Sequence, residues 1–228
     1  MSLDHNSYIP IDGLVFCLDP ANSRSYSGSG NTVYNLASGS SIGATKSSGV
    51  TYNSTAPATF SSTASNFLIS DYTLTSGTSF TVSMWFKRVG SLYWMSLFGN
   101  GVWLNSTGYV ARLESTQKIR FSEGGSFTGI VYDDPALVSA NYNHYVFVKN
   151  TSGTDSYIYL NGNQVANGSL SNVSITKPIV FNTRYNNDGN GYVDSQASQF
   201  SHITVHNRAL SVTEVKQIYN ATKRRFGY

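Results

Sequence analysis

Short stretches in which apolar and polar residues alternate one by one recur along this chain of 228 residues, and they constrain its fold more than any other feature. In the clearest, residues 80–87, every second residue is apolar and the other face is more polar apart from Trp85. A period of two is typical of a β-strand with one buried face. The same reasoning predicts strands at residues 14–18, 109–113, 118–122, 142–149, 157–160, 178–183 and 198–205. Roughly ten or more short strands separated by Gly-, Asn- and Ser-rich turns predict an all-β antiparallel sandwich.

Two local signals mark a hairpin and a helix. Asn161-Gly162 follows one predicted strand, and both residue types tolerate the positive φ angles of a tight hairpin turn. Ser211 and Glu214 form a capping box, after which apolar residues follow at spacings of three and four. We therefore expect one short C-terminal helix of about ten residues that packs on the sandwich.

The chain lacks a linker rich enough in Pro or Gly to separate two domains. We expect an N-terminal arm over residues 1–12 and one sandwich domain over residues 13–228. Residues 37–64 hold few large apolar side chains and are predicted as a long surface loop with short edge strands. The arm and the basic end at residues 223–228 are either docking segments or frayed termini.

Charge and composition exclude several classes of protein. Only 12% of residues are charged and the net charge is +3, so there is no concentrated basic face of the kind that binds nucleic acid. No apolar run approaches the roughly 20 residues of a membrane helix, and the N-terminus lacks the pattern of a signal peptide. The single cysteine, Cys17, lies in an apolar run and is interpreted as buried.

Five motifs, in order, resemble a laminin G-like, concanavalin A-like jelly-roll family that is common in tailed bacteriophages. They are GLVFCLDPANSRSY at 13–26, TVYNLASG at 32–39, FTVSMWFK at 80–87, YIYLNG at 157–162 and ITVHNRALS with the following helix from 203. The resemblance implies a concanavalin A-like jelly roll over nearly the whole chain. Where the family pattern has Trp, Asp and Tyr, this chain has Val33, Asn35 and His206. The loss of an acid at Asn35 weakens the case for calcium there.

Catalytic groups are sparse. Glycoside hydrolysis needs two carboxyl groups about 5–10 Å apart, yet the chain has only three glutamates and none has an acidic partner at strand spacing. Asp133 and Asp134 are adjacent and precede a proline, which indicates a turn. The Glu-x-Asp-x-x-Glu strand of similar glucanases is absent. His202 and His206 lack a third ligand for zinc and are interpreted as polar-face residues, so we expect no enzymatic activity.

Calcium is the metal that the sequence favours, although no cofactor is required. Asp188, Asn190 and Asp194 offer side-chain oxygens within a Gly-containing loop, and calcium takes six to eight oxygen ligands. The alternative is an ordinary polar turn, because Asn, Asp and Gly favour turns. Asp19 is a second candidate ligand by resemblance, unless it only accepts hydrogen bonds from amides of its own loop.

Aromatic residues near loop-like sequence are candidate platforms for a sugar. These are Trp94, Trp103, Tyr132 and Tyr192. The alternative role for each is packing in the core or on a sheet face.

Taken together, the resemblance and the low charge predict a non-enzymatic structural or accessory protein on the surface of a tailed phage virion, either a capsid decoration or a tail or baseplate accessory. Its partners would be other virion proteins and, where it aids adhesion, host surface polysaccharide; we expect neither nucleic-acid binding nor membrane insertion. The alternative function is a carbohydrate-binding, lectin-like adhesion module assisted by calcium. A glycoside hydrolase is the remote alternative.

Overall fold

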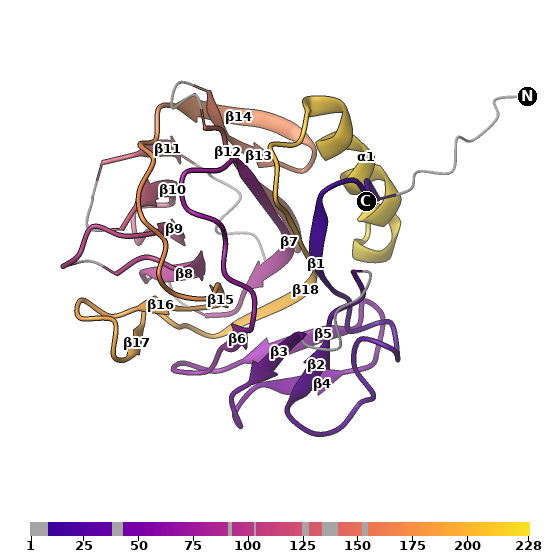
Figure 1. Cartoon of the computed structure of the whole chain (residues 1–228). Coiled ribbons are helices and arrows are strands. Elements are labelled where there is room, and N and C mark those ends of the chain that lie inside the picture. Colours follow the sequence, from indigo (N-terminus) through magenta and orange to yellow (C-terminus); the bar gives the residue numbers. More distant parts are fainter. Residues whose placement is uncertain are drawn as a thin grey trace, which may run out of the picture.

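The computed structural model describes residues 9–37, 43–90, 93–102, 104–124, 128–133, 141–151 and 155–228. Two antiparallel sheets pack face to face, with one helix at the C-terminal end (Figure 1). The predicted antiparallel sandwich with a single C-terminal helix is confirmed.

The first sheet contains eight strands in the order β14-β13-β12-β7-β18-β5-β4, and β1 pairs with β18 beside this path. Its members are β1 (Leu14–Leu18), β4 (Thr51–Asn53), β5 (Thr59–Ser62), β7 (Phe80–Arg88), β12 (Asn143–Lys149), β13 (Ser156–Leu160), β14 (Asn163–Gly168) and β18 (Ser198–His206). Asn161 and Gly162 have φ angles of 50° and 80° between β13 and β14, which confirms the predicted hairpin turn.

The second sheet also contains eight strands, in the order β11-β10-β9-β8-β15-β6-β3-β2. They are β2 (Thr32–Tyr34), β3 (Gly43–Lys46), β6 (Leu68–Ser70), β8 (Met95–Gly99), β9 (Tyr109–Leu113), β10 (Lys118–Glu123), β11 (Ile130–Asp133) and β15 (Val180–Phe181). A separate two-stranded ribbon, β16 (Arg184–Tyr185) and β17 (Tyr192–Val193), follows β15. The strand predicted at residues 178–183 is therefore reduced to two residues.

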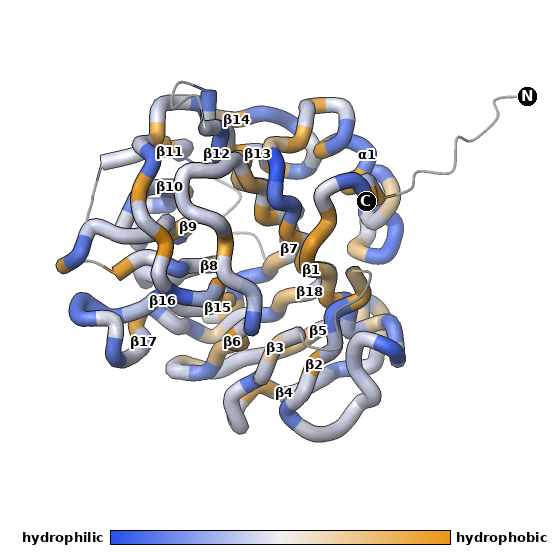
Figure 2. The backbone as a smooth tube through the Cα atoms, viewed as in Figure 1, coloured by the Kyte–Doolittle hydropathy of each residue, from blue (hydrophilic) through white to orange (hydrophobic). Residues whose placement is uncertain are grey.

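The main hydrophobic core lies between the two sheets and is rich in phenylalanine. Phe98, Phe121 and Phe147 come from both sheets, and their ring centroids lie 5.4–6.1 Å apart. The hydrophobic segments follow the strands, whereas the ribbon of β16 and β17 is largely hydrophilic (Figure 2). Period-two patterning thus positions the core as the sequence predicts.

The outer face of β7 is buried as well, which the alternation of the strand did not indicate. The helix α1 (Val212–Thr222) and the 3-10 helix η2 (Lys223–Phe226) cover this face. Trp85 is fully buried there: its ring stacks on Phe226 with centroids 4.2 Å apart, and its Nε1 donates to Thr222 Oγ1 at 2.8 Å. Residues 223–228 are consequently a packed layer and not a frayed end.

The polar-face interpretation of His202 and His206 is wrong in one respect, because both side chains are buried. They expose 3% and 0% of their surface. His202 occupies a bulge in β18 at a φ of 44°, where the pairing with β7 shifts register between Ser201 and Thr204. On one side of this bulge β5 pairs with β18, and on the other side β1 does.

The prediction for residues 37–64 is also partly wrong. Although β4 is an exposed edge strand, β5 lies between β4 and β18 in the first sheet, and Phe60 contributes to the core. Small side chains hide this strand from a pattern search, since Thr59 and Ser62 are buried polar residues. Within the described residues, no helix is long and apolar enough to span a bilayer.

Candidate functional site

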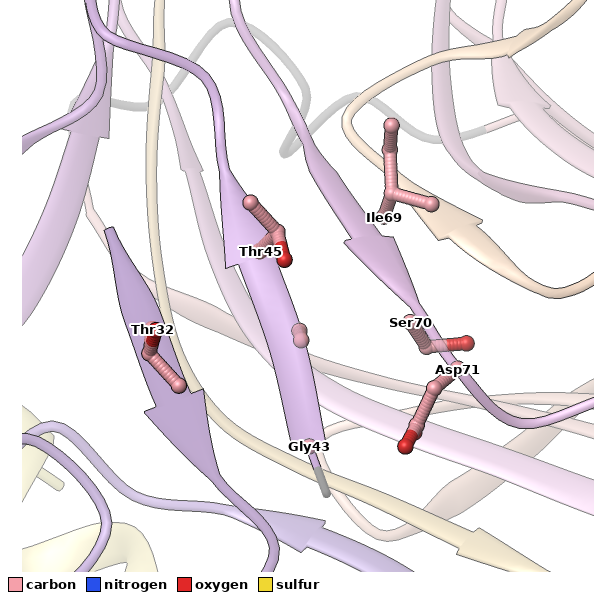
Figure 3. Close-up of a pocket in the computed structure, with 7 residues that line it drawn as sticks. Thr32, Gly43, Thr45, Ile69, Ser70 and Asp71 are labelled. Atoms are coloured by element: carbon pink, nitrogen blue, oxygen red, sulfur yellow. The ribbon is translucent and has the colours of Figure 1, made fainter.

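The outer face of the second sheet carries a groove over three neighbouring strands. Alternation places Thr45 and Ile69 on this face, because Ala44 and Leu68 point into the core. Figure 3 shows the side chains projecting from β2, β3 and β6 along the groove. It encloses about 420 Å³ and is lined by Thr32, Gly43, Ala44, Thr45, Ile69, Ser70 and Asp71.

Close approach of the backbones shapes the floor of this groove. A Cβ atom at Gly43 would clash with the carbonyl oxygen of Val33 on β2, so only glycine fits there. The Ser70 hydroxyl is already bonded to the carbonyl oxygen of Ile179 at 2.7 Å. The hydroxyls of Thr32 and Thr45 and the Asp71 carboxylate are the polar groups that remain for a ligand.

A second hollow of about 510 Å³ lies at the ribbon of β16 and β17. It is lined by Leu104, Arg184, Asn186, Asn187, Asp188, Val193 and Asp194. Between the two strands, the Asn186 amide nitrogen donates to the carbonyl oxygen of Gly191 at 2.9 Å, and Asp188 Oδ1 accepts from the backbone of Asn190 at 3.0 Å. The ribbon is thus closed by a turn in which the side chains of Asn186 and Asp188 accept hydrogen bonds from the backbone amides of Asn190 and Gly191.

A buried polar hub anchors the base of the ribbon. Asn182 is fully buried at a φ of 60°, and its Nδ2 lies 2.7 Å from Ser62 Oγ and 2.8 Å from the carbonyl oxygen of Asn66. Its Oδ1 accepts from Ser198 Oγ at 2.8 Å. Because these partners belong to different strands and loops, Asn182 fixes the start of the ribbon relative to both sheets.

An apolar cluster lies against the wall of the groove. Val102, Val180 and Tyr185 form the cluster, and Ile69 from the wall of the groove packs against it. Tyr192, 37% exposed, lies with its ring centroid 4.3 Å from that of Phe67 and 5.3 Å from that of Tyr185. The cluster itself is buried, so Tyr192 is the aromatic side chain of the ribbon that reaches solvent.

The charges of this face are mostly compensated. Arg184 Nε lies 2.6 Å from Asp194 Oδ2, so that carboxylate is neutralised by its neighbour. The backbone amide of Asn190 lowers the pKa of Asp188, which keeps this exposed carboxylate ionised. Burial raises the pKa of Asp71, with its own backbone amide opposing the shift. Asp188 is thus the main uncompensated charge of the second hollow.

The structure brings together only some of the residues that the sequence singled out as calcium ligands. Asp188, Asn190 and Asp194 share the ribbon, but Asp194 is bound to Arg184 and the oxygen of Asp188 is turned to the backbone. Asp19 lies elsewhere, held by both terminal nitrogens of Arg225 at 2.8 Å. In the described part of the chain, no group of three or more His, Cys, Asp or Glu side chains is placed to hold a metal ion.

The candidate aromatic residues for sugar binding also lie at different places in the fold. Tyr192 is partly exposed on the ribbon and packs on Phe67, and Trp94 stacks its ring 5.1 Å from the guanidinium carbon of Arg112 on β9. Tyr132 packs against the main core. Trp103 lies outside the described residues.

Sequence reasoning missed the groove and part of the second hollow. Thr45 and Asp71 come from segments that carry no motif, and Thr32 opens the motif at 32–39, which is interpreted only as a mark of the family. The signal that could have found Asn187 is its place in the Asn-Asn-Asp-Gly stretch, which on sequence alone is interpreted as a calcium loop or a polar turn.

A family model for the concanavalin A-like lectin/glucanases superfamily matches residues 60–216, more than half of the chain. The chain belongs to this superfamily. A comparison with curated protein sequences gave no match.

Solved structures show the same fold at low sequence identity. The receptor-binding domain of botulinum neurotoxin D superposes with a TM-score of 0.69 at 15% identity over 93% of this chain and 53% of that one. The binding domain of botulinum neurotoxin DC, solved in complex with SialylT, gives 0.68 and 15% over 92% and 52%. The binding domain of Paraclostridial Mosquitocidal Protein 1 gives 0.67 and 18% over 92% and 52%. This chain spans about half the length of these chains.

Proposed function

We propose that this protein is a carbohydrate-binding domain and that the outer face of the second sheet is its binding surface. The observation that carries the proposal is the presence of two polar hollows together with the partly exposed ring of Tyr192 on the adjoining ribbon. Two findings support it: membership of a superfamily that includes lectins, and the fold shared with a binding domain solved with SialylT. The alternative function inferred from the sequence therefore takes precedence over the purely structural one.

The chemistry of the face suits a sugar. Small-ligand sites are concave, about 300–1,000 Å³ in volume, and combine apolar surface with a few placed polar groups. In the second hollow, the amide of Asn187 and the carboxylate of Asp188 are hydrogen-bonding partners for hydroxyls, while Leu104 and Val193 offer apolar contact. Tyr192, the neighbour of Val193 on β17, adds a partly exposed aromatic side chain to the ribbon.

We further propose that the domain binds without catalysis. Hydrolysis of a glycosidic bond needs two carboxyl groups that flank it. Among the described residues, Asp71 is the one carboxylate that lines the groove, and in the second hollow Asp194 is paired with Arg184.

The setting that we propose is the surface of a tailed phage particle, where the domain would contact other virion proteins. The support is the order of the five sequence motifs. On such a surface, a glycan-binding face would aid adhesion to host polysaccharide.

The test is a glycan panel with the whole chain, followed by titration of the best ligand. We expect one class of glycan to bind, and Asn187→Ala and Tyr192→Ala to weaken affinity about tenfold, equivalent to about 1.4 kcal/mol. Asn187 is a clean target because its side chain makes no hydrogen bond within the described residues. Asn220→Ala, on the exposed face of α1, is the matched control and should bind like the wild type. Absence of any glycan ligand, or equal binding by all variants, would overturn the proposal.

A further inference from the structure

A third hollow lies on the opposite side of the molecule, where the C-terminal layer meets β1 and β18. It encloses about 470 Å³ and is lined by Ile9, Asp19, His202, Ala221, Thr222, Arg224 and Arg225. Figure 1 shows α1 and the C-terminus beside β1. None of these residues lines either hollow of the proposed glycan-binding face.

The side-chain oxygen atoms of Asp19 and Thr222 in this hollow already accept hydrogen bonds from other side chains of the protein. The carboxylate of Asp19 accepts from both terminal nitrogens of Arg225, at 2.8 Å each. The Thr222 hydroxyl accepts from Trp85 Nε1 and donates to the carbonyl oxygen of Ile218, both at 2.8 Å. A ligand would find no free carboxylate here.

Two buried side-chain nitrogen atoms of the lining residues, in contrast, have no hydrogen-bond partner. His202 exposes only 3% of its surface, and its Nδ1 has no hydrogen-bond partner; the buried Nε of Arg225 has none either. Arg224 is exposed, and its side chain forms no ion pair or hydrogen bond within the described chain. Because Asp19 pairs with Arg225, the charge of Arg224 is the surplus among the described residues that line the hollow.

A hollow with an unmatched guanidinium N–H, an unpaired imidazole nitrogen and one surplus positive charge favours a negatively charged hydrogen-bond acceptor. We propose that this cleft binds a small oxyanion, the phosphate or carboxylate group of a ligand, with Arg224 as its principal cation and His202 in its wall. The site does not depend on the glycan-binding function, because it lies on the other sheet and uses other residues.

The test is a two-dimensional NMR titration of the full chain with sodium phosphate and, separately, sodium acetate, at ionic strength held constant with sodium chloride. We expect saturable shifts of the amide signals of His202 and of residues 222–225. A response to phosphate alone identifies a phosphate group as the ligand chemistry, and a response to acetate identifies a carboxylate.

Two arginine variants decide between a site and general charge attraction. Arg224→Gln should weaken the affinity at least fivefold, whereas Arg24→Gln, which removes an equally exposed arginine elsewhere, should stay within twofold of the wild type. Both residues are exposed, so neither change should impair folding. The proposal is overturned if neither anion gives a saturable response, or if Arg224→Gln binds as the wild type does.

Discussion

The side-chain amide of Asn35 makes hydrogen bonds with backbone groups like those that a peptide group of a neighbouring strand would make. Its Oδ1 accepts from the amides of Cys17 and Ala37 at 2.8 and 3.0 Å, and its Nδ2 donates to the carbonyl oxygen of Val15 at 2.9 Å. The side chain therefore extends the hydrogen bonding of β1 into the next loop. Where the family pattern has an acid, this chain needs both a donor and an acceptor.

The change Asn35→Asp tests this role. A carboxylate keeps the two accepted bonds but loses the donor and faces the carbonyl oxygen of Val15, so we expect the free energy of unfolding to fall by about 1–3 kcal/mol. Urea denaturation at pH 7 measures it. Asn167→Asp, at an exposed position, should change stability by less than about 0.5 kcal/mol. Equal stability of the Asn35→Asp variant and the wild type would show that the donated bond contributes nothing.

At the scale of elements, the sequence predicted what depends on local periodicity. The capping box is present: Ser211 accepts from the amide of Glu214, and α1 begins at Val212. By contrast, β8 carries no regular alternation, because a register shift against β9 between Ser96 and Phe98 interrupts it. The partners of the site could not be predicted, since Asp19 meets Arg225 across 206 positions and Asn182 meets Ser62 across 120. Such pairs follow from the order of strands in the sheets and not from spacing.

The C-terminal layer is an integral part of the sandwich, and Phe226 is the residue that tests it. Its ring lies nearly parallel to that of Trp85, at an interplanar angle of 9°. We expect Phe226→Ala to destabilise the fold by about 3 kcal/mol and to shift tryptophan fluorescence to the red, since the cavity would admit water beside Trp85. Val212→Ala, half-exposed on the same helix, should leave both measurements nearly unchanged. If Phe226→Ala unfolded at the same temperature as the wild type, the packing of Phe226 on Trp85 would contribute nothing to stability.

At the scale of the whole molecule, three buried histidines lie on the side of the first sheet that the C-terminal layer covers. Burial lowers the pKa of His144 to about 3 and that of His202 to about 4, and it also lowers the pKa of His206. His144 bonds Ser83 Oγ at 2.8 Å and lies against Trp85. The folded state therefore holds these rings neutral, whereas the unfolded chain protonates them at a pKa of about 6.5.

Acid should consequently destabilise the fold at mildly acidic pH through these histidines. Because the folded pKa values are depressed, the unfolded state binds more protons, and stability falls as the pH drops from about 6.5 towards 4, by about 1.4 kcal/mol per pH unit for each buried histidine. Asp19 and Glu214, whose pKa values are also lowered, add to the loss only below about pH 4.5. Urea midpoints at pH 7.5, 6 and 5 measure the slope, which His144→Gln should make shallower by removing one titrating ring. Midpoints that do not change between pH 7.5 and 5 would mean that the rings are already charged, or open to water, in the folded state.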